Sequence, residues 1–87
     1  MSDFTRQTML EDVFNDMYGI KPEVYYQRID RNTYKIKLVY NGKEAILTEI
    51  MENGLTKTAT LEYIGAVKNH KSMYNAEKEA VEFLRSE

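Results

Sequence analysis

The sequence predicts an α+β fold in which an N-terminal helix, an antiparallel meander of three or four strands and a C-terminal helix follow one another. Apolar residues recur at helical spacing near both ends, the middle of the chain alternates apolar with polar residues, and two Asn-Gly dipeptides divide that middle. The length of 87 residues predicts one α+β domain over residues 1–87. We expect both helices to lie on one sheet face, since each needs an apolar surface to cover its stripe.

The first helix is predicted over residues 5–18. Its apolar face follows the i, i+3, i+4, i+7 spacing and consists of Leu10, Val13, Phe14 and Met17. Asp3 or Thr5 is the expected N-cap, and Gly19 stands where a left-handed residue ends a helix. The opposite face is then expected to be acidic and exposed, with Glu11, Asp12, Asn15 and Asp16.

Residues 23–63 are predicted to form the strands. Asn41-Gly42 favours a two-residue hairpin turn, because both residues accept positive φ. The register that follows places apolar residues opposite each other, with Leu38 facing Ala45 and Ile36 facing Leu47. A helix over residues 43–53, capped by Asn41 and Gly54, is the alternative for this stretch.

The next turn is interpreted as a three-residue loop, Glu52-Asn53-Gly54, with Gly54 left-handed. A two-residue turn would shift the register by one and bring Thr58 and Thr60 into the core. The loop instead pairs Leu47 with Ala59, Ala45 with Leu61, and Glu49 with Lys57.

The second helix is predicted over residues 73–86, with Ser72 as its N-cap. Its apolar stripe consists of Met73, Ala76, Ala80, Phe83 and Leu84. Residues 64–71 leave two alternatives open: the preceding strand continues to Val67, or a short turn of helix forms.

This order of elements resembles the double-stranded RNA-binding domain, in length and in the Ser-capped final helix. In that family the final helix opens with lysines that contact phosphates, and the first helix lies in the RNA minor groove. The matching stretch here, residues 72–78, has only Lys78 as a basic residue, and the first helix is acidic. Because affinity for a duplex depends on neutralising phosphates, no RNA-binding residue is carried over from the resemblance.

Composition narrows the classes of function. The chain has no cysteine, one histidine and a net charge of −2, and no apolar run approaches the ~20 residues of a membrane span. The N-terminus lacks the basic and apolar regions of a signal peptide, so a cytoplasmic location is expected. The residues supply no nucleophile–base pair, metal-ligand spacing or phosphate-binding glycine loop, so we expect no enzyme, no metal and no cofactor.

The sheet face away from the helices is the predicted partner-binding surface, because no segment remains to cover it. Its candidate residues are Val39, Ile46, Thr48, Ile50 and Thr58. The hypothesis is a small regulatory module that binds a protein partner or a second copy of itself. A chain this small without catalytic residues also fits an accessory or inhibitor protein of a phage or mobile element.

A second hypothesis is weak binding of nucleic acid or a phosphate ligand. Lys68, His70 and Lys71 precede the N-terminus of the last helix, where backbone N–H groups and the helix dipole favour an anion. Arg28, Lys35 and Lys37 would add basic residues from the sheet. The net charge of −2 disfavours this alternative.

Overall fold

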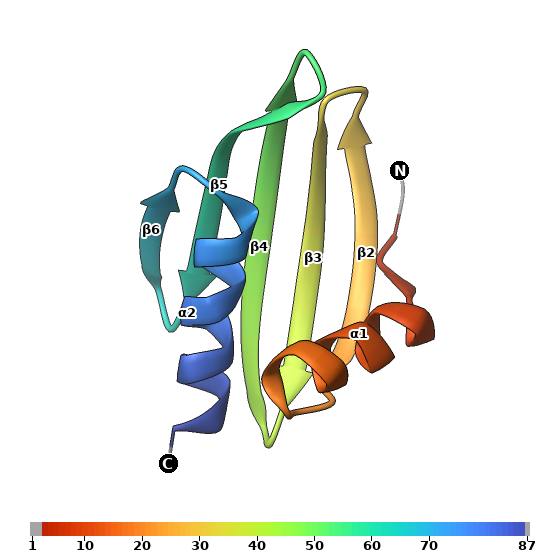
Figure 1. Ribbon diagram of the computed structural model, residues 1–87, viewed down its shortest axis with the longest axis vertical. Coiled ribbons are helices and arrows are strands. Elements are labelled where there is room, and N and C mark those ends of the chain that lie inside the picture. The colour runs from red at the N-terminus through yellow and green to blue at the C-terminus, as the bar shows by residue number, and fades with distance from the viewer. Residues whose placement is uncertain (1–2, 87) are drawn as a thin grey trace.

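The computed structural model describes residues 3–86, which form two helices and six strands (Figure 1). In chain order these elements are β1 (Thr5–Arg6), α1 (Thr8–Tyr18), β2 (Glu23–Asp30), β3 (Thr33–Tyr40), β4 (Lys43–Glu52), β5 (Leu55–Tyr63), β6 (Ala66–His70) and α2 (Met73–Arg85). Residues 1, 2 and 87, which complete the predicted domain, lie outside the described residues.

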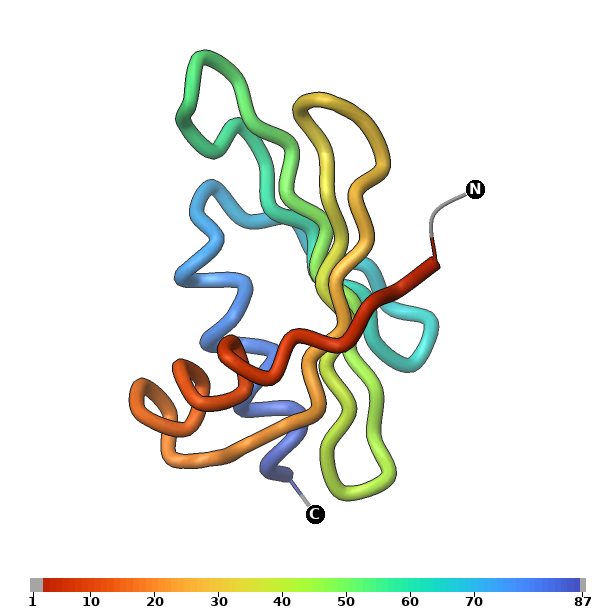
Figure 2. The backbone as a smooth tube through the Cα atoms, turned by 90° about the vertical axis from the view of Figure 1, so that its right-hand side faces the viewer, coloured from red at the N-terminus to blue at the C-terminus, as the bar shows by residue number. Residues whose placement is uncertain are grey.

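The six strands form one antiparallel sheet whose spatial order, β1-β2-β3-β4-β5-β6, is also the chain order. Both helices lie on one side of it (Figure 2). We call the helix side the inner face and the opposite side the outer face. The predicted order of helix, meander and helix is confirmed, but three or four strands was wrong, because short strands, β1 and β6, extend the meander at both edges.

The N-terminal helix is shorter than predicted. Thr5 and Arg6 pair with β2 instead of starting the helix, and α1 begins at Thr8. Gln7 occupies the N-cap position without a side-chain hydrogen bond, so the predicted caps at Asp3 or Thr5 were wrong. Backbone pairing with an open sheet edge therefore outweighs a side-chain cap here. The predicted C-terminus is confirmed, since Gly19 ends the helix at φ 78°.

The hairpin of β3 and β4 has the predicted register. Leu38 faces Ala45 and Ile36 faces Leu47, around a turn in which Asn41 and Gly42 have φ of 54° and 77°. The alternative helix over residues 43–53 was wrong, because β4 is a strand that pairs along its length on both sides.

The hairpin of β4 and β5 departs from prediction. Glu52 pairs with Leu55 around a two-residue turn, and a bulge follows because Lys57 has no partner between Thr56 and Thr58. Leu47 therefore faces Leu61 and Glu49 faces Ala59, not the predicted partners. The bulge adds one residue and so returns Ala59 and Leu61 to the inner face, which a two-residue turn alone would not do.

Neither alternative for residues 64–71 was right, because β5 ends at Tyr63 and a third X-Gly hairpin leads into β6. Ile64 has φ 47° and Gly65 has φ 73°, close to the values in the two Asn-Gly turns. A β-branched residue rarely adopts positive φ. The Ile64 side chain is 84% exposed, so packing does not compensate for this backbone conformation.

Replacing Ile64 with asparagine should therefore stabilise the protein. Asparagine tolerates the left-handed region, in which a β-branched residue costs on the order of 1 kcal/mol. We expect thermal unfolding to shift upward by about 4–8 °C for a stabilisation of ~1 kcal/mol. The reverse change at the equivalent turn position, Asn53→Ile, should lower the midpoint. A lower or unchanged midpoint for Ile64→Asn would show that the turn is not strained.

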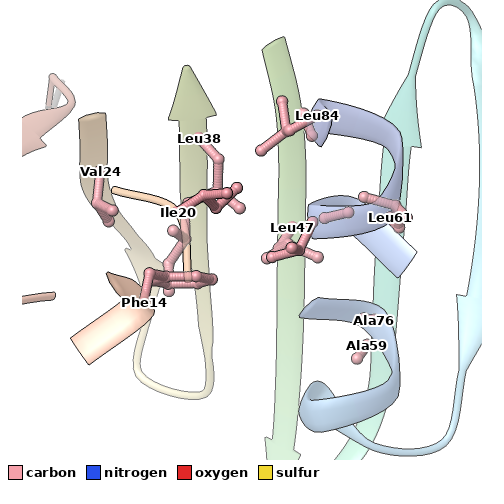
Figure 3. Packing of buried hydrophobic residues seen from close by; sticks show 13 residues of the cluster. Phe14, Ile20, Val24, Leu38, Leu47, Ala59, Leu61, Ala76 and Leu84 are labelled. Carbon is pink, nitrogen blue, oxygen red and sulfur yellow. The ribbon is translucent and has the colours of Figure 1, made fainter. Parts of the chain in front are cut away.

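The core lies between the inner face and the helices, and Figure 3 shows its packing. Leu38, Leu47 and Leu61 are fully buried on neighbouring strands, and Leu84 of α2 belongs to the same buried cluster. Four of the five alanines are also fully buried, namely Ala45, Ala59, Ala76 and Ala80. Small side chains on both the sheet and α2 let the helix backbone approach the strands closely. The Ser72 hydroxyl caps α2 as predicted, accepting from the Asn75 N–H at 3.2 Å.

Helix α1 turns a different side to the sheet than predicted. Phe14 is buried and Leu10 packs against the core, but Val13 and Met17 are 46% and 53% exposed. Glu11, predicted to be exposed, is only 4% exposed. The prediction was wrong at these positions because the apolar residues of α1 cover a wide part of its circumference. Their spacing does not show which side of that apolar surface contacts the sheet.

Glu11 is buried because its carboxylate hydrogen-bonds to the backbone of β2 at Val24. Its Oε2 atom accepts from the Val24 backbone N–H at 3.1 Å and from Arg6 Nε at 2.7 Å. Gln7 N–H donates to the Val24 carbonyl oxygen at 2.8 Å, so both backbone groups of Val24 are satisfied. The Arg6 hydrogen bond lowers the pKa of the Glu11 carboxyl, followed in effect by the Val24 N–H, against the opposing effect of burial.

Candidate protein-binding surface

All five predicted partner-binding residues lie on the outer face, where Figure 2 shows no helix. Ile50 is 38% exposed, and the other four, Val39, Ile46, Thr48 and Thr58, are partly exposed. These five residues belong to β3, β4 and β5, the central part of the sheet. Thr56, which precedes the bulge at Lys57, lies instead on the inner face, where its hydroxyl donates to Glu49.

On the outer face, the strand register places polar residues between the aliphatic ones. Ile46 lies between Lys37 and Glu62 across the sheet, and this row continues to Val67 on β6. Ile50 lies between two threonines, Thr33 and Thr58. The next row is a polar ladder consisting of Gln27, Lys35, Thr48, Thr60 and Asn69. The surface is therefore mixed, with stiff β-branched side chains between opposite charges.

An aromatic cluster borders this surface at the β2 edge. Lys37 Nζ lies 4.9 Å from the Phe4 ring centre and 5.2 Å from that of Tyr25. The Tyr25 hydroxyl donates to Glu23, and this hydrogen bond is the main cause of the raised pKa of Tyr25. The cluster fixes the amine of Lys37, one of the basic residues of the nucleic-acid hypothesis.

The structure brings Lys68 and His70 together and leaves Lys71 apart. Both converge on Glu79 of α2: Lys68 Nζ lies 2.9 Å from Glu79 Oε2, and His70 Nε2 lies 3.0 Å from Glu79 Oε1. The Tyr63 hydroxyl donates to Glu79 at 3.1 Å. Glu79 raises the pKa of Lys68, and Lys68 in turn lowers the pKa of Glu79.

These residues line a shallow hollow of about 620 Å³ between β6 and α2, together with Lys78, Glu82 and Phe83. Glu79 therefore already contacts two of the three residues predicted to hold an anion, Lys68 and His70. The role of Glu79 was not predicted from the sequence. Lys68 and His70 lie two residues apart in the strand β6, and this spacing places both on the face that Glu79 contacts.

A second buried carboxylate, Glu49, also went unnoticed. It is 5% exposed on the inner face of β4 and accepts hydrogen bonds from the Tyr34 and Thr56 hydroxyls. Nearby, Glu77 of α2 accepts from the Tyr18 hydroxyl at 3.0 Å. Burial is the main cause of the raised pKa of Glu77, and the charge of Glu49 adds to it. The carboxylates are held by hydroxyl donors, which is the arrangement of a satisfied polar core.

No set of three potential metal ligands comes together anywhere in residues 3–86. Neither helix in the described part of the chain is long and apolar enough to cross a membrane. No protein family, curated protein or solved structure matches the chain.

Proposed function

We propose that the chain is a non-enzymatic protein-binding module that contacts its partner through the outer face of the sheet. The observation that carries this proposal is the bare central surface around Ile46, which the described helices leave uncovered. Its threonine and aliphatic side chains have few rotamers, so they lose little conformational entropy when a partner covers them. The charges beside Ile46, on Lys37 and Glu62, would orient that partner.

The described polar side chains support a binding role rather than catalysis. The Ser72 hydroxyl caps α2, and the Ser86 hydroxyl donates to the Phe83 carbonyl oxygen at 2.6 Å. His70, the one histidine of the chain, is held by Glu79. Ser72, Ser86 and His70 thus each have a structural partner, and none of these three pairs joins a serine to the histidine.

Ile46→Arg should leave the fold intact and abolish association. The side chain is partly exposed on a strand, where substitutions change the free energy of unfolding by about 1 kcal/mol or less. In the centre of an interface, an unpaired arginine costs roughly 2 kcal/mol or more, or at least a ~30-fold loss of affinity. Affinity capture from lysate of the source organism, with and without nuclease, would compare this variant with wild type.

Leu55→Arg is the matched control, because Leu55 is 73% exposed in the β4–β5 hairpin, at the first position of β5 and away from Ile46. We expect this control to retain the partner. Analytical ultracentrifugation of the purified protein would show whether the partner is a second copy. A wild type that is monomeric and captures no protein would refute the proposal, as would a partner that Ile46→Arg also retains.

A further inference from the structure

Helix α1 carries a second apolar stripe that faces away from the sheet. Leu10 and Phe14 occupy the side that packs against the core. Met9, Val13 and Met17 follow at intervals of four residues, and their exposed fractions are 81%, 46% and 53%. Side chains four residues apart lie one above another on a helix, so these three form a continuous line.

Nothing in the described chain covers this line. Figure 2 shows α1 standing out from the sheet, with no element beyond it on the side away from the strands. A surface helix typically has one apolar stripe and polar residues elsewhere. Methionine is flexible and polarisable, which suits it to surfaces that adapt to a partner. A second stripe with two methionines is thus better suited to binding than to solvent.

The line ends in a hollow between the two helices. A cavity of about 400 Å³ opens beside Met17 and is lined on the α2 side by Tyr74 and three charged residues, Lys78, Glu82 and Arg85. Tyr74 is itself 56% exposed and extends the apolar surface from α1 to α2. The hydrogen bond from the Tyr18 hydroxyl to Glu77 fixes the two helices at this point. The hollow offers a place for an anchoring side chain of a partner.

Acidic residues flank the line on one side. At 100° per residue, Asp12 and Asp16 fall next to Met9 and Val13 around the helix. Lys21 Nζ pairs with Asp12 at 3.0 Å, whereas Asp16 forms no ion pair within residues 3–86. A second copy of α1 packed against the line would bring its own Asp12 and Asp16 toward this flank. A partner with basic residues beside its apolar ones would meet complementary charge instead.

We propose that Met9, Val13 and Met17 form a docking line for an amphipathic helix of a partner protein, with a basic flank facing Asp12 and Asp16. Apolar residues of the partner at i, i+4 and i+7 would lie along this docking line, and one would enter the hollow beside Met17. The proposal is independent of the sheet surface, because α1 and the outer face lie on opposite sides of the sheet.

The test uses a fluorescent synthetic peptide of about 18 residues with leucine and lysine at amphipathic spacing, titrated with the full chain and followed by anisotropy. We expect saturable binding that weakens as salt rises. Met9→Gln combined with Met17→Gln should weaken it about tenfold or more, because both anchors are lost. Asp16→Lys should weaken it and flatten its dependence on salt.

Four controls make the test decisive. Leu55→Gln removes an equally exposed apolar side chain elsewhere and should bind the peptide like wild type. A peptide of the same composition in scrambled order should bind more weakly, and one with glutamate for lysine should not bind. Ile46→Arg should bind normally, which separates this proposal from that of the sheet surface. Equal binding by the double variant, equal binding of the scrambled peptide, or no binding up to about 1 mM would overturn the proposal.

Discussion

Leu47→Ala is expected to lower the free energy of unfolding by about 3–4 kcal/mol, the largest effect of any substitution considered. Leu47 is fully buried at the centre of the sheet, between Ile36 on β3 and Leu61 on β5. The truncation removes apolar surface and leaves a cavity that α2 and two neighbouring strands cannot close. A domain of this size has a total stability on the order of 5–10 kcal/mol, so the variant should be partly unfolded at moderate denaturant.

Urea unfolding followed by circular dichroism would measure this effect. Ile50→Ala is the matched control, since Ile50 lies on the same strand but on the outer face, 38% exposed. It should cost about 1 kcal/mol or less. Equal losses for the two variants would contradict the assignment of inner and outer faces along β4.

Glu11→Ala is expected to cost about 3 kcal/mol, because it leaves the buried Val24 N–H without an acceptor and removes the partner of Arg6. Glu11→Gln should cost less, since an amide oxygen can still accept from Val24. The exposed pair of Asp12 and Lys21 provides the comparison, and Asp12→Ala should cost about 1 kcal/mol or less. Thermal unfolding of the three variants would rank them.

The contribution of Glu11 to the free energy of unfolding should decrease as the pH falls. Its folded-state pKa lies below the ordinary value of about 4.3, so the ionised carboxylate stabilises the fold fully above that pH. The stabilisation is lost as pH falls through the lowered folded-state pKa. The difference in stability between wild type and Glu11→Gln should therefore be constant at neutral pH and shrink in acid. A difference that persists unchanged at pH ~2 would show that the charge of Glu11 contributes nothing.

The sequence predicted most reliably where a local signal and the apolar pattern agreed. Asn41-Gly42 gave the correct register of β3 and β4, because its turn geometry and the pairing of Leu38 with Ala45 point to the same answer. The predicted register of β4 and β5 was wrong because it allowed for no bulge. A two-residue turn alone would place the wrong residues on the inner face, and the extra residue at Lys57 reverses that shift. The pattern of apolar residues predicts which face of the sheet a residue lies on. It does not determine the cross-strand partners, because several registers place the same residues on the same face.

The missed features depend on contacts between distant parts of the chain. Glu11 is buried because Arg6 and Val24 meet it at the sheet edge, and no local pattern shows that edge. The β5–β6 hairpin went unrecognised because Ile64 stands where asparagine is usual. The predicted residues of the outer face were placed on one surface correctly, as alternation requires, but the charges between them became visible only with the register.

The chain-order arrangement of the strands has a consequence for synthesis. Each strand pairs with the one made just before it, so hairpins can form progressively with short loop closures. Their apolar side is covered mainly by α2, whose residues are made after those of all six strands. A nascent or C-terminally truncated chain would therefore expose Leu38, Leu47 and Leu61 together, making incomplete chains aggregation-prone and good substrates for chaperones or proteases until α2 docks.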